Sequence, residues 1–268
     1  MKRSPIGLLA GAGGGLLVLF LGLPILALLA RAVTGGLLPE AAGASAVLEA
    51  LGLSLVTTLA SLALAVALGT PLAYALARRR VRGRALLEAL VDLPIVLPPA
   101  VAGLALLLVL GRRGWIGGPL EALGISIPFT TVAVVLAQTF VAAPFFVRAA
   151  RTGFAGVDRH LEDAARVDGA SEASVFWHVT LPLAAPALAP GLVMTWARAL
   201  GEFGATIMFA GNFAGRTQTL PLVVYGEFQA GALDAAVAAA AILVLAALGV
   251  LIAVRGFGWR RALDVRSI

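Results

Sequence analysis

Residues 50–77 read ALGLSLVTTLASLALAVALGTPLAYALA, and no charged side chain interrupts them between Glu49 and Arg78. A helix needs about 20 consecutive, mainly apolar residues to cross the hydrocarbon core of a bilayer, so this run is long enough. Lipid offers the backbone no hydrogen-bond partners, which leaves α-helices and closed barrels as spanning structures. A barrel strand has only about 10 residues and alternates apolar with polar side chains. The run has neither property, so it predicts a transmembrane helix.

The rest of the chain has the same apolar character. Of its 268 residues, 60% are hydrophobic and 13% are charged, whereas soluble domains carry about 25% charged residues. The mean hydropathy is +1.00, so lipid must surround most of the surface. The net charge of +6 does not indicate a nucleic-acid partner, because the basic residues lie between apolar runs, where membrane topology explains them. The absence of cysteine excludes disulfides and thiol chemistry.

The apolar runs predict an all-α integral membrane protein with six transmembrane helices in a single domain over residues 1–268. The expected spans are residues 5–30, 50–77, 85–110, 122–147, 182–202 and 235–254. The first run follows Lys2 and Arg3 and therefore also fits a secretory signal peptide. We favour an uncleaved helix, because the core of a signal peptide has only about 7–15 residues.

The positions of the basic residues predict the orientation, because Lys and Arg are enriched in cytoplasmic loops. With the N-terminus inside, most of the 20 Lys and Arg residues fall in the inner segments. The exceptions are Arg198, which lies in a span, and four residues of the outer segments: Arg31, Arg112, Arg113 and Arg216. This bias predicts a multi-pass protein of the inner (cytoplasmic) membrane with both termini in the cytoplasm. Residues 148–181 then form the longest cytoplasmic loop.

This loop contains a short helix with its own start and stop signals. Asp158 can cap the N-terminus of the helix, and Gly169 suits the left-handed residue that ends one. Helical spacing places four apolar residues on one face: Val157, Leu161, Ala164 and Ala165. A helix that lies on lipid favours Trp, Phe or Leu on its buried face. Small side chains instead let another backbone approach closely, so we expect a groove on a partner protein to receive this helix.

The loop also carries an extended motif. Asp163-Ala164-Ala165, three further residues, Gly169 and later the segment 179–182 (VTLP) match the spacing of the EAA loop. In this respect the chain resembles the permeases of binding-protein-dependent ABC importers, although Asp163 replaces the usual Glu and Glu162 precedes it. The resemblance implies a coupling helix that docks on a separate ATPase subunit, present in two copies on the cytoplasmic face. The residues implied in this coupling are Glu162, Asp163, Ala164, Ala165, Gly169 and Ala170.

The chain itself is not expected to be an enzyme. Its only lysine is Lys2, so the phosphate-binding motif Gly-x4-Gly-Lys-Ser/Thr is absent. ATP hydrolysis is therefore expected in a partner subunit. The 2 histidines, His160 and His178, belong to no His-Glu-x-x-His metal motif. We expect neither a metal nor a cofactor.

Three further stretches narrow the family. Residues 93–103 (LPIVLPPAVAG) resemble the third-span signature of oxyanion and related permeases, and residues 201–212 (GEFGATIMFAGN) share an outline with sulfate and molybdate permeases. Residues 215–222 (GRTQTLPL) resemble molybdate permeases specifically. The resemblance extends from about Gly52 to the C-terminus. It implies the type I ABC importer permease fold, a homodimer, an external substrate-binding protein and molybdate as substrate, with tungstate as a further candidate.

Five residues are candidates for the translocation pathway: Pro98, Pro99, Arg198, Glu202 and Gly204. An ionisable residue in a span is costly and usually functional, so Arg198 can attract an anion. Alternatively, Arg198 and Glu202 neutralise each other on one helix face, or Arg198 extends outward to water. The two prolines break the hydrogen bonds of their helix, which either shapes a gate or leaves a structural kink. The apolar residues around Gly204 favour a re-entrant segment over a plain outer loop.

Other classes of protein fit the sequence less well. A sulfate or thiosulfate permease is the alternative within the family. A secondary transporter driven by protons or sodium would need acidic residues near the bilayer midplane, and the spans have almost none. An intramembrane enzyme would need a nucleophile with a base or a pair of carboxylates. Glu88 and Asp92 lie near the inner interface, and no span supplies a clear second group.

Overall fold

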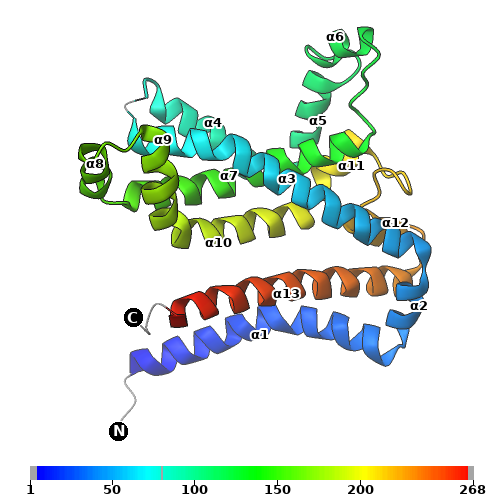
Figure 1. Cartoon of the computed structure of the whole chain (residues 1–268). Helices are drawn as coiled ribbons and strands as arrows, with labels where there is room; N and C mark the ends of the chain where they lie inside the picture. The colour runs from blue at the N-terminus through cyan, green and yellow to red at the C-terminus, as the bar shows by residue number, and fades with distance from the viewer. Residues whose placement is uncertain (1–4, 80, 265–268) are drawn as a thin grey trace.

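The computed structural model describes the backbone of residues 5–79 and 81–264, and the side chains of residues 13–79 and 81–252 (Figure 1). Within these ranges the chain forms helices joined by turns and contains no β-strand, which confirms the all-α prediction. The long helices are α1 (Pro5–Thr34), α3 (Ser45–Arg78), α7 (Thr131–Gly156), α10 (Leu181–Leu200) and α13 (Leu233–Asp264). The shorter ones are α2 (Leu37–Gly43), α4 (Arg84–Val96), α5 (Pro99–Leu110), α6 (Gly117–Ala122), α8 (Arg159–Val167), α9 (Glu172–Val175), α11 (Gly204–Ala210) and α12 (Leu220–Gln229).

In the described residues, 5 helices are long and apolar enough to cross a membrane, and α4 with α5 makes a further, broken candidate. The axes of α4 and α5 meet at 118°. Pro99 occupies the first turn of α5, where its missing N–H is tolerated. A residue before proline is driven into extended backbone, and Leu97 and Pro98 adopt ψ angles of 136° and 132°. The predicted break at the two prolines is confirmed, and it turns α5 away from the line of α4.

The long helices all differ in extent from the expected spans, and α7 and α10 differ most in where they begin. α7 begins at Thr131 rather than at residue 122, because residues 117–122 fold separately as α6. The side chain of Thr130 caps α7 and accepts a hydrogen bond from the backbone N–H of Ala133 at 3.3 Å. α10 is continued backwards by α9 and by a π-helical turn, η1 (Phe176–Thr180), so that one helix runs over Glu172–Leu200.

Small residues bring α3, α7 and α10 close together. A Cβ atom added at Gly69 of α3 would lie 2.9 Å from the ring of Phe146 in α7. One added at Gly191 of α10 would lie 2.3 Å from the Cβ of Ala149 in α7. Such contacts are typical of helix bundles in membranes, where van der Waals packing drives association. The buried cluster beside them is made by Ala73, Phe146, Val147, Ala150, Phe154, Val157, Ala184 and Leu188.

Beside this group of three, the helices α1 and α13 run along one side of the molecule (Figure 1). Only 6% of the most apolar window of α1 is buried inside the chain. Its exposed side chains include Leu16, Val18, Phe20 and Leu26. Water is a poor solvent for such a surface, whereas lipid is as apolar as the side chains themselves. The described helices therefore form a multi-pass membrane protein.

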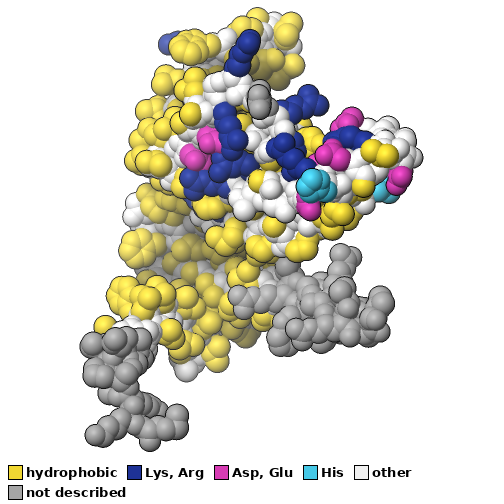
Figure 2. Space-filling model, turned by 90° about the vertical axis from the view of Figure 1, so that its left-hand side faces the viewer, with side chains coloured by type: hydrophobic (Ala, Val, Ile, Leu, Met, Phe, Trp, Pro, Cys, Tyr) yellow, Lys and Arg dark blue, Asp and Glu magenta, His cyan; other side chains and the backbone are white. Residues whose placement is uncertain are grey.

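The bundle has two distinct ends. We call one of them the α8 end, because α8 and α9 lie there with the end of α3, the start of α4 and the end of α7 (Figure 1). The helices α2 and α12 lie at the opposite end. Figure 2 looks onto the α8 end and shows Arg and carboxylate side chains gathered over it, with apolar side chains around them. Charged side chains are thus gathered at the α8 end, beyond the apolar parts of the long helices.

Candidate functional site

The helix predicted in the loop 148–181 is α8, which projects from the α8 end of the bundle (Figure 1). Its capping follows the sequence prediction. The side chain of Asp158 accepts a hydrogen bond from the backbone N–H of His160 at 3.0 Å. Gly169 follows the helix with a φ of +89°, a backbone conformation that glycine adopts without strain. The side chain of Ser171 then caps α9 through the N–H of Ser174 at 3.2 Å.

One side of α8 faces outward. Asp163, Ala164 and Gly169 are exposed, and Ala165 and Ala170 are half-buried. Two large apolar side chains are also open, because Leu161 is 50% and Val167 is 87% exposed. Leu161 and Ala164 thus share an exposed side, whereas Val157, expected on the same face, is buried against the bundle. Apolar side chains on a helix outside the membrane bundle are a surface suited to a protein partner.

Glu162 faces the opposite way from its neighbour Asp163. Both residues are among those expected to couple to the ATPase, but the Glu162 side chain is only 4% exposed. Its Oε1 atom lies 3.0 Å from Nη2 of Arg78, at the end of α3. The same oxygen accepts a hydrogen bond from the Thr180 hydroxyl at 2.7 Å. Successive residues of a helix point about 100° apart, so adjacent carboxylates need not share a surface.

The charge of Asp163, by contrast, stays on the surface of the loop. Arg166 donates a hydrogen bond to Asp163 at 2.7 Å and two to Glu172 at 2.7 and 3.2 Å, which links α8 to α9. These bonds hold the pKa of the Glu172 carboxyl below its ordinary value. The guanidinium pKa of Arg166 is raised for the same reason. The outward surface of α8 is therefore braced by a charged contact that water can reach.

Further ion pairs connect α4 with α7 at the α8 end (Figure 2). Arg148 holds Asp92 with two parallel hydrogen bonds of 2.7 and 2.8 Å. Glu88 pairs with Arg84 one turn away at 2.7 Å and also with Arg151 of α7. These carboxylates, noted in the sequence near the inner interface, bind arginines rather than one another. They fasten the first half of the broken span to the bundle.

The structure brings four of the five pathway candidates together as two pairs, of which Pro99 and Gly204 are the first. A Cβ atom at Gly204 would lie 2.7 Å from the Cβ of Pro99, so α11 begins directly against the start of α5. Further along the same contact, a Cβ at Gly103 would lie 2.7 Å from the carbonyl oxygen of Ala205. α11 is folded back into the bundle, where Phe209 is fully buried. Ala205, Phe209 and Ala210 of α11 are thus buried, whereas Met208 is 39% exposed.

Arg198 and Glu202 form an ion pair within one helix turn. Their Nη2 and Oε2 atoms lie 2.7 Å apart, and the Glu202 side chain is 1% exposed. The other carboxylate oxygen of Glu202 accepts a hydrogen bond from the N–H of Ala205 at 2.8 Å. Of the alternatives given above for Arg198, the structure has the one in which Arg198 and Glu202 neutralise each other. The Glu202 carboxylate also binds a backbone N–H in the first turn of α11.

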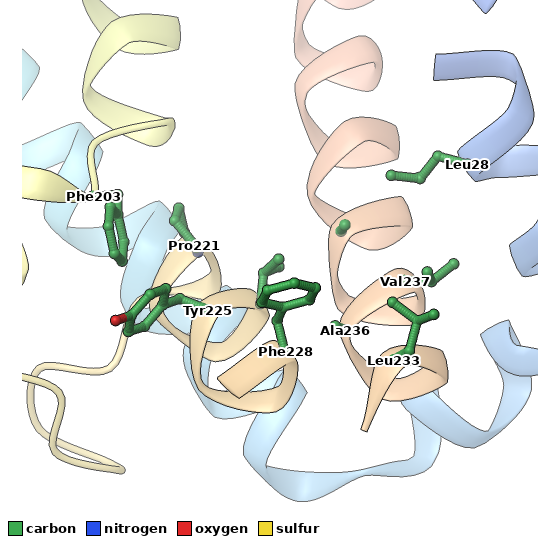
Figure 3. Close-up of a pocket in the computed structure, with 10 residues that line it drawn as sticks. Leu28, Phe203, Pro221, Tyr225, Phe228, Leu233, Ala236 and Val237 are labelled. Atoms are coloured by element: carbon green, nitrogen blue, oxygen red, sulfur yellow. The ribbon is translucent and has the colours of Figure 1, made fainter. Parts of the chain in front are cut away.

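At the end of the bundle opposite α8, a cavity of about 380 Å³ opens between α1, α12 and α13 (Figure 3). Leu28, Phe228, Leu233 and Val237 line it from three helices. As far as the described residues define the lining, it is apolar except for the Tyr225 hydroxyl. Such a lining offers no charge to an anion. The described residues also contain no group of three His, Asp or Glu side chains that could hold a metal ion.

The described helices, with a broken third span, a folded-back α11 and a projecting loop helix, have the type I ABC importer permease fold. A solved bacterial ABC transporter involved in the import of the acidic polysaccharide alginate shares this fold. The TM-score is 0.72, with 91% of this chain and 91% of that chain covered, at 18% identity. The predicted fold class is confirmed.

Sequence comparison defines the family. The family model described as binding-protein-dependent transport system inner membrane component matches residues 65–257. The molybdenum transport system permease protein of Mycobacterium tuberculosis is 51% identical over 209 residues, 76% of this chain and 77% of that protein. The chloroplastic sulfate permease 2 of Chlamydomonas reinhardtii is 38% identical over 253 residues, 94% of this chain and 68% of that protein. The chain belongs to the family of binding-protein-dependent transport system inner membrane components, as its EAA-like loop predicted.

Proposed function

We propose that this chain is the membrane-spanning permease of an ATP-driven molybdate importer, with tungstate as a further candidate substrate. The main support is its similarity to a permease named for molybdenum transport, which is 51% identical. A relative named for sulfate is 38% identical, so a sulfate or thiosulfate permease is the second candidate. The segment 215–222, which resembles molybdate permeases, favours the first.

In this proposal α8 is the coupling helix. Its outward residues Asp163, Ala164, Ala165, Gly169 and Ala170 contact an ATPase subunit, and two such subunits serve a homodimer of the permease. The exposed Leu161 and Val167 support this contact, because they give a partner apolar surface to bury. ATP hydrolysis belongs to that subunit, in keeping with the absence of a phosphate-binding loop here.

The proposed orientation places the α8 end in the cytoplasm. The support is the collection of arginines at this end, since basic residues are retained on the cytoplasmic side. Both termini are then cytoplasmic, and the protein lies in the cytoplasmic membrane. A substrate-loaded binding protein docks at the opposite end. The six spans and the single domain over residues 1–268 are part of the same proposal.

We place the translocation pathway beside the contact between α5 and α11. The tight approach of Gly204 to Pro99 supports this position, because glycine has no side chain that must repack when α11 shifts against α5. Pro98 and Pro99 set the direction of α5. Arg198 and Glu202 supply a charge pair at the turn into α11, where a neutral pair avoids trapping a dianion that must also be released.

Reconstitution in liposomes with the cognate ATPase subunit and binding protein tests the function. ATP hydrolysis is measured with the binding protein loaded with molybdate, tungstate or sulfate. We expect molybdate to stimulate hydrolysis and sulfate to leave it at the level of the unloaded binding protein. Equal stimulation by sulfate would refute the molybdate assignment. Failure of an ATPase subunit to copurify with the permease would refute the importer itself.

A further inference from the structure

Three segments of the chain meet at the single side chain of Glu162, and a fourth is linked to it through Arg78. Arg78, the last residue of α3, lies 3.0 Å from Glu162 Oε1 and also donates a hydrogen bond to the carbonyl oxygen of Val157 at 2.8 Å. Val157 is the residue that ends α7. The Thr180 hydroxyl, directly before α10, donates to the same Oε1 atom at 2.7 Å. We call Arg78, Glu162 and Thr180 the α8 anchor.

The α8 anchor is buried although the helix that it holds is not. The side chains of Arg78 and Glu162 are 7% and 4% exposed, and Thr180 is fully buried. Asp163 and Ala164, the next residues of α8, are exposed. A buried ion pair is weak evidence for stability, because apolar side chains of similar volume often stabilise a fold as well or better. A buried ion pair does fix the relative position of its two side chains, because a buried charge that loses its partner is strongly destabilising.

The backbone around Thr180 is also unusual. Residues Phe176–Thr180 form a π-helical turn, and such turns are rare and occur frequently at functional sites. The ring of Phe176 in this turn packs against Tyr74 of α3 and Phe154 of α7, with centroids 5.2 and 6.0 Å apart. The turn is therefore held on the same two helices whose ends Arg78 ties to α8. Polar and aromatic contacts together make a rigid junction.

From these contacts we infer that the α8 anchor transmits displacements of α8 into α3 and α10. The inference rests on the proposed function, in which an ATPase subunit grips the outward side of α8. Glu162 then acts from the inward side as a positioning residue, and it touches neither the ATPase nor the anion. When α8 is displaced, Glu162 moves Arg78 and Thr180 with it. The end of α3 and the start of α10 therefore follow α8. Without the anchor, α8 can move while the bundle stays behind.

Substitutions at Thr180 separate this role from a contact with the ATPase. Thr180→Val keeps the shape of the side chain and removes the hydroxyl that donates to Glu162, whereas Thr180→Ser keeps the hydroxyl. Each variant is reconstituted in liposomes with the ATPase subunit and the loaded binding protein, and anion transported per ATP hydrolysed is measured. We expect Thr180→Val to keep the ATPase bound and to lower this ratio about tenfold, the factor that corresponds to losing a hydrogen bond to a charged group. Thr180→Ser should restore the ratio.

A second variant keeps the inference testable if Thr180→Val does not fold. Glu162→Gln retains the size of the side chain and removes the charge that Arg78 binds, so it should lower the same ratio while the ATPase still copurifies. Ratios equal to that of the parent chain in Thr180→Val or in Glu162→Gln, with the ATPase bound, would overturn the inference. If the parent chain itself binds no ATPase, the proposed function fails instead, so the two failures are distinguishable.

Discussion

Replacing Gly191 with alanine tests whether α7 and α10 lie at a separation that requires glycine. A Cβ atom at this position would be 2.3 Å from the Cβ of Ala149, whereas carbon atoms are in favourable contact at about 3.5–4.0 Å. The two helices must therefore separate locally by about 1 Å or more. Overpacking of this kind costs about 1–3 kcal/mol. Since 1 kcal/mol shifts the melting temperature of a chain of this size by about 2–4 °C, we expect a fall of roughly 2–12 °C.

Thermal unfolding in detergent, followed by the fluorescence of the 4 tryptophans, measures this effect. Gly52→Ala in α3 is the matched control, because a Cβ there meets nothing within 4 Å. It should keep or raise the melting temperature, since alanine favours a helix over glycine by about 1 kcal/mol. Combining Gly191→Ala with Ala149→Gly moves the methyl group to the other helix and should recover most of the loss. If Gly191→Ala melts like Gly52→Ala, the close approach of α7 and α10 is refuted.

Three further outcomes are expected. Ala164→Trp on the exposed side of α8 should abolish copurification of the ATPase subunit without lowering the melting temperature of the isolated permease; a retained ATPase would contradict the docking surface. The pKa of Glu172 is lowered by hydrogen bonds from Arg166, so this contact stabilises the loop above the ordinary pKa of glutamate and is lost as the pH falls through the lower, folded-state value. The protection of backbone amides in residues 159–172 against hydrogen exchange, relative to an unstructured peptide, should thus fall below about pH 4, whereas in Glu172→Gln it should be low at neutral pH as well. Glu202→Ala leaves the charge of Arg198 without its partner, so we expect a loss of about 3 kcal/mol, and an unchanged melting temperature would argue against the pair.

The helical class and the break in the third span could be predicted from the sequence because both depend on local chemistry. A run without charges, such as residues 50–77, fits lipid wherever it lies in the fold. Proline acts on its own and the preceding residue, so the bend at Pro98 and Pro99 needs no tertiary information. Caps are equally local, as Asp158 shows. The start of α7 was placed too early because an apolar run does not reveal where its first turn is capped.

Long-range polar contacts could not be predicted in the same way. Glu162 and Asp163 are adjacent carboxylates, and nothing in their order shows that Glu162 meets Arg78, which lies far earlier in the chain at the end of α3. That choice depends on which side of α8 the bundle occupies. The pair of Arg198 and Glu202 was foreseen as one of three alternatives, because a spacing of four residues allows a contact without requiring it. Helical spacing indicates which side chains can reach each other, and the packing of the helices decides which of these contacts form.

The π-helical turn makes the junction between α9 and α10 tolerant of the loss of one residue. A π-helical turn holds about one residue more than an α-helical turn, so deleting one residue, for example the exposed Trp177, would restore a regular helix. Because the π-helical turn takes up this extra residue with little rotation of the helices on either side, α8 and α9 would keep their orientation around the axis of α10. A deletion in the regular part of α10 would instead rotate them by about 100°, the angle by which an α-helix advances per residue. Shortening the π-helical turn by one residue would thus remove the distortion of the backbone and leave the exposed side of α8 pointing in the same direction.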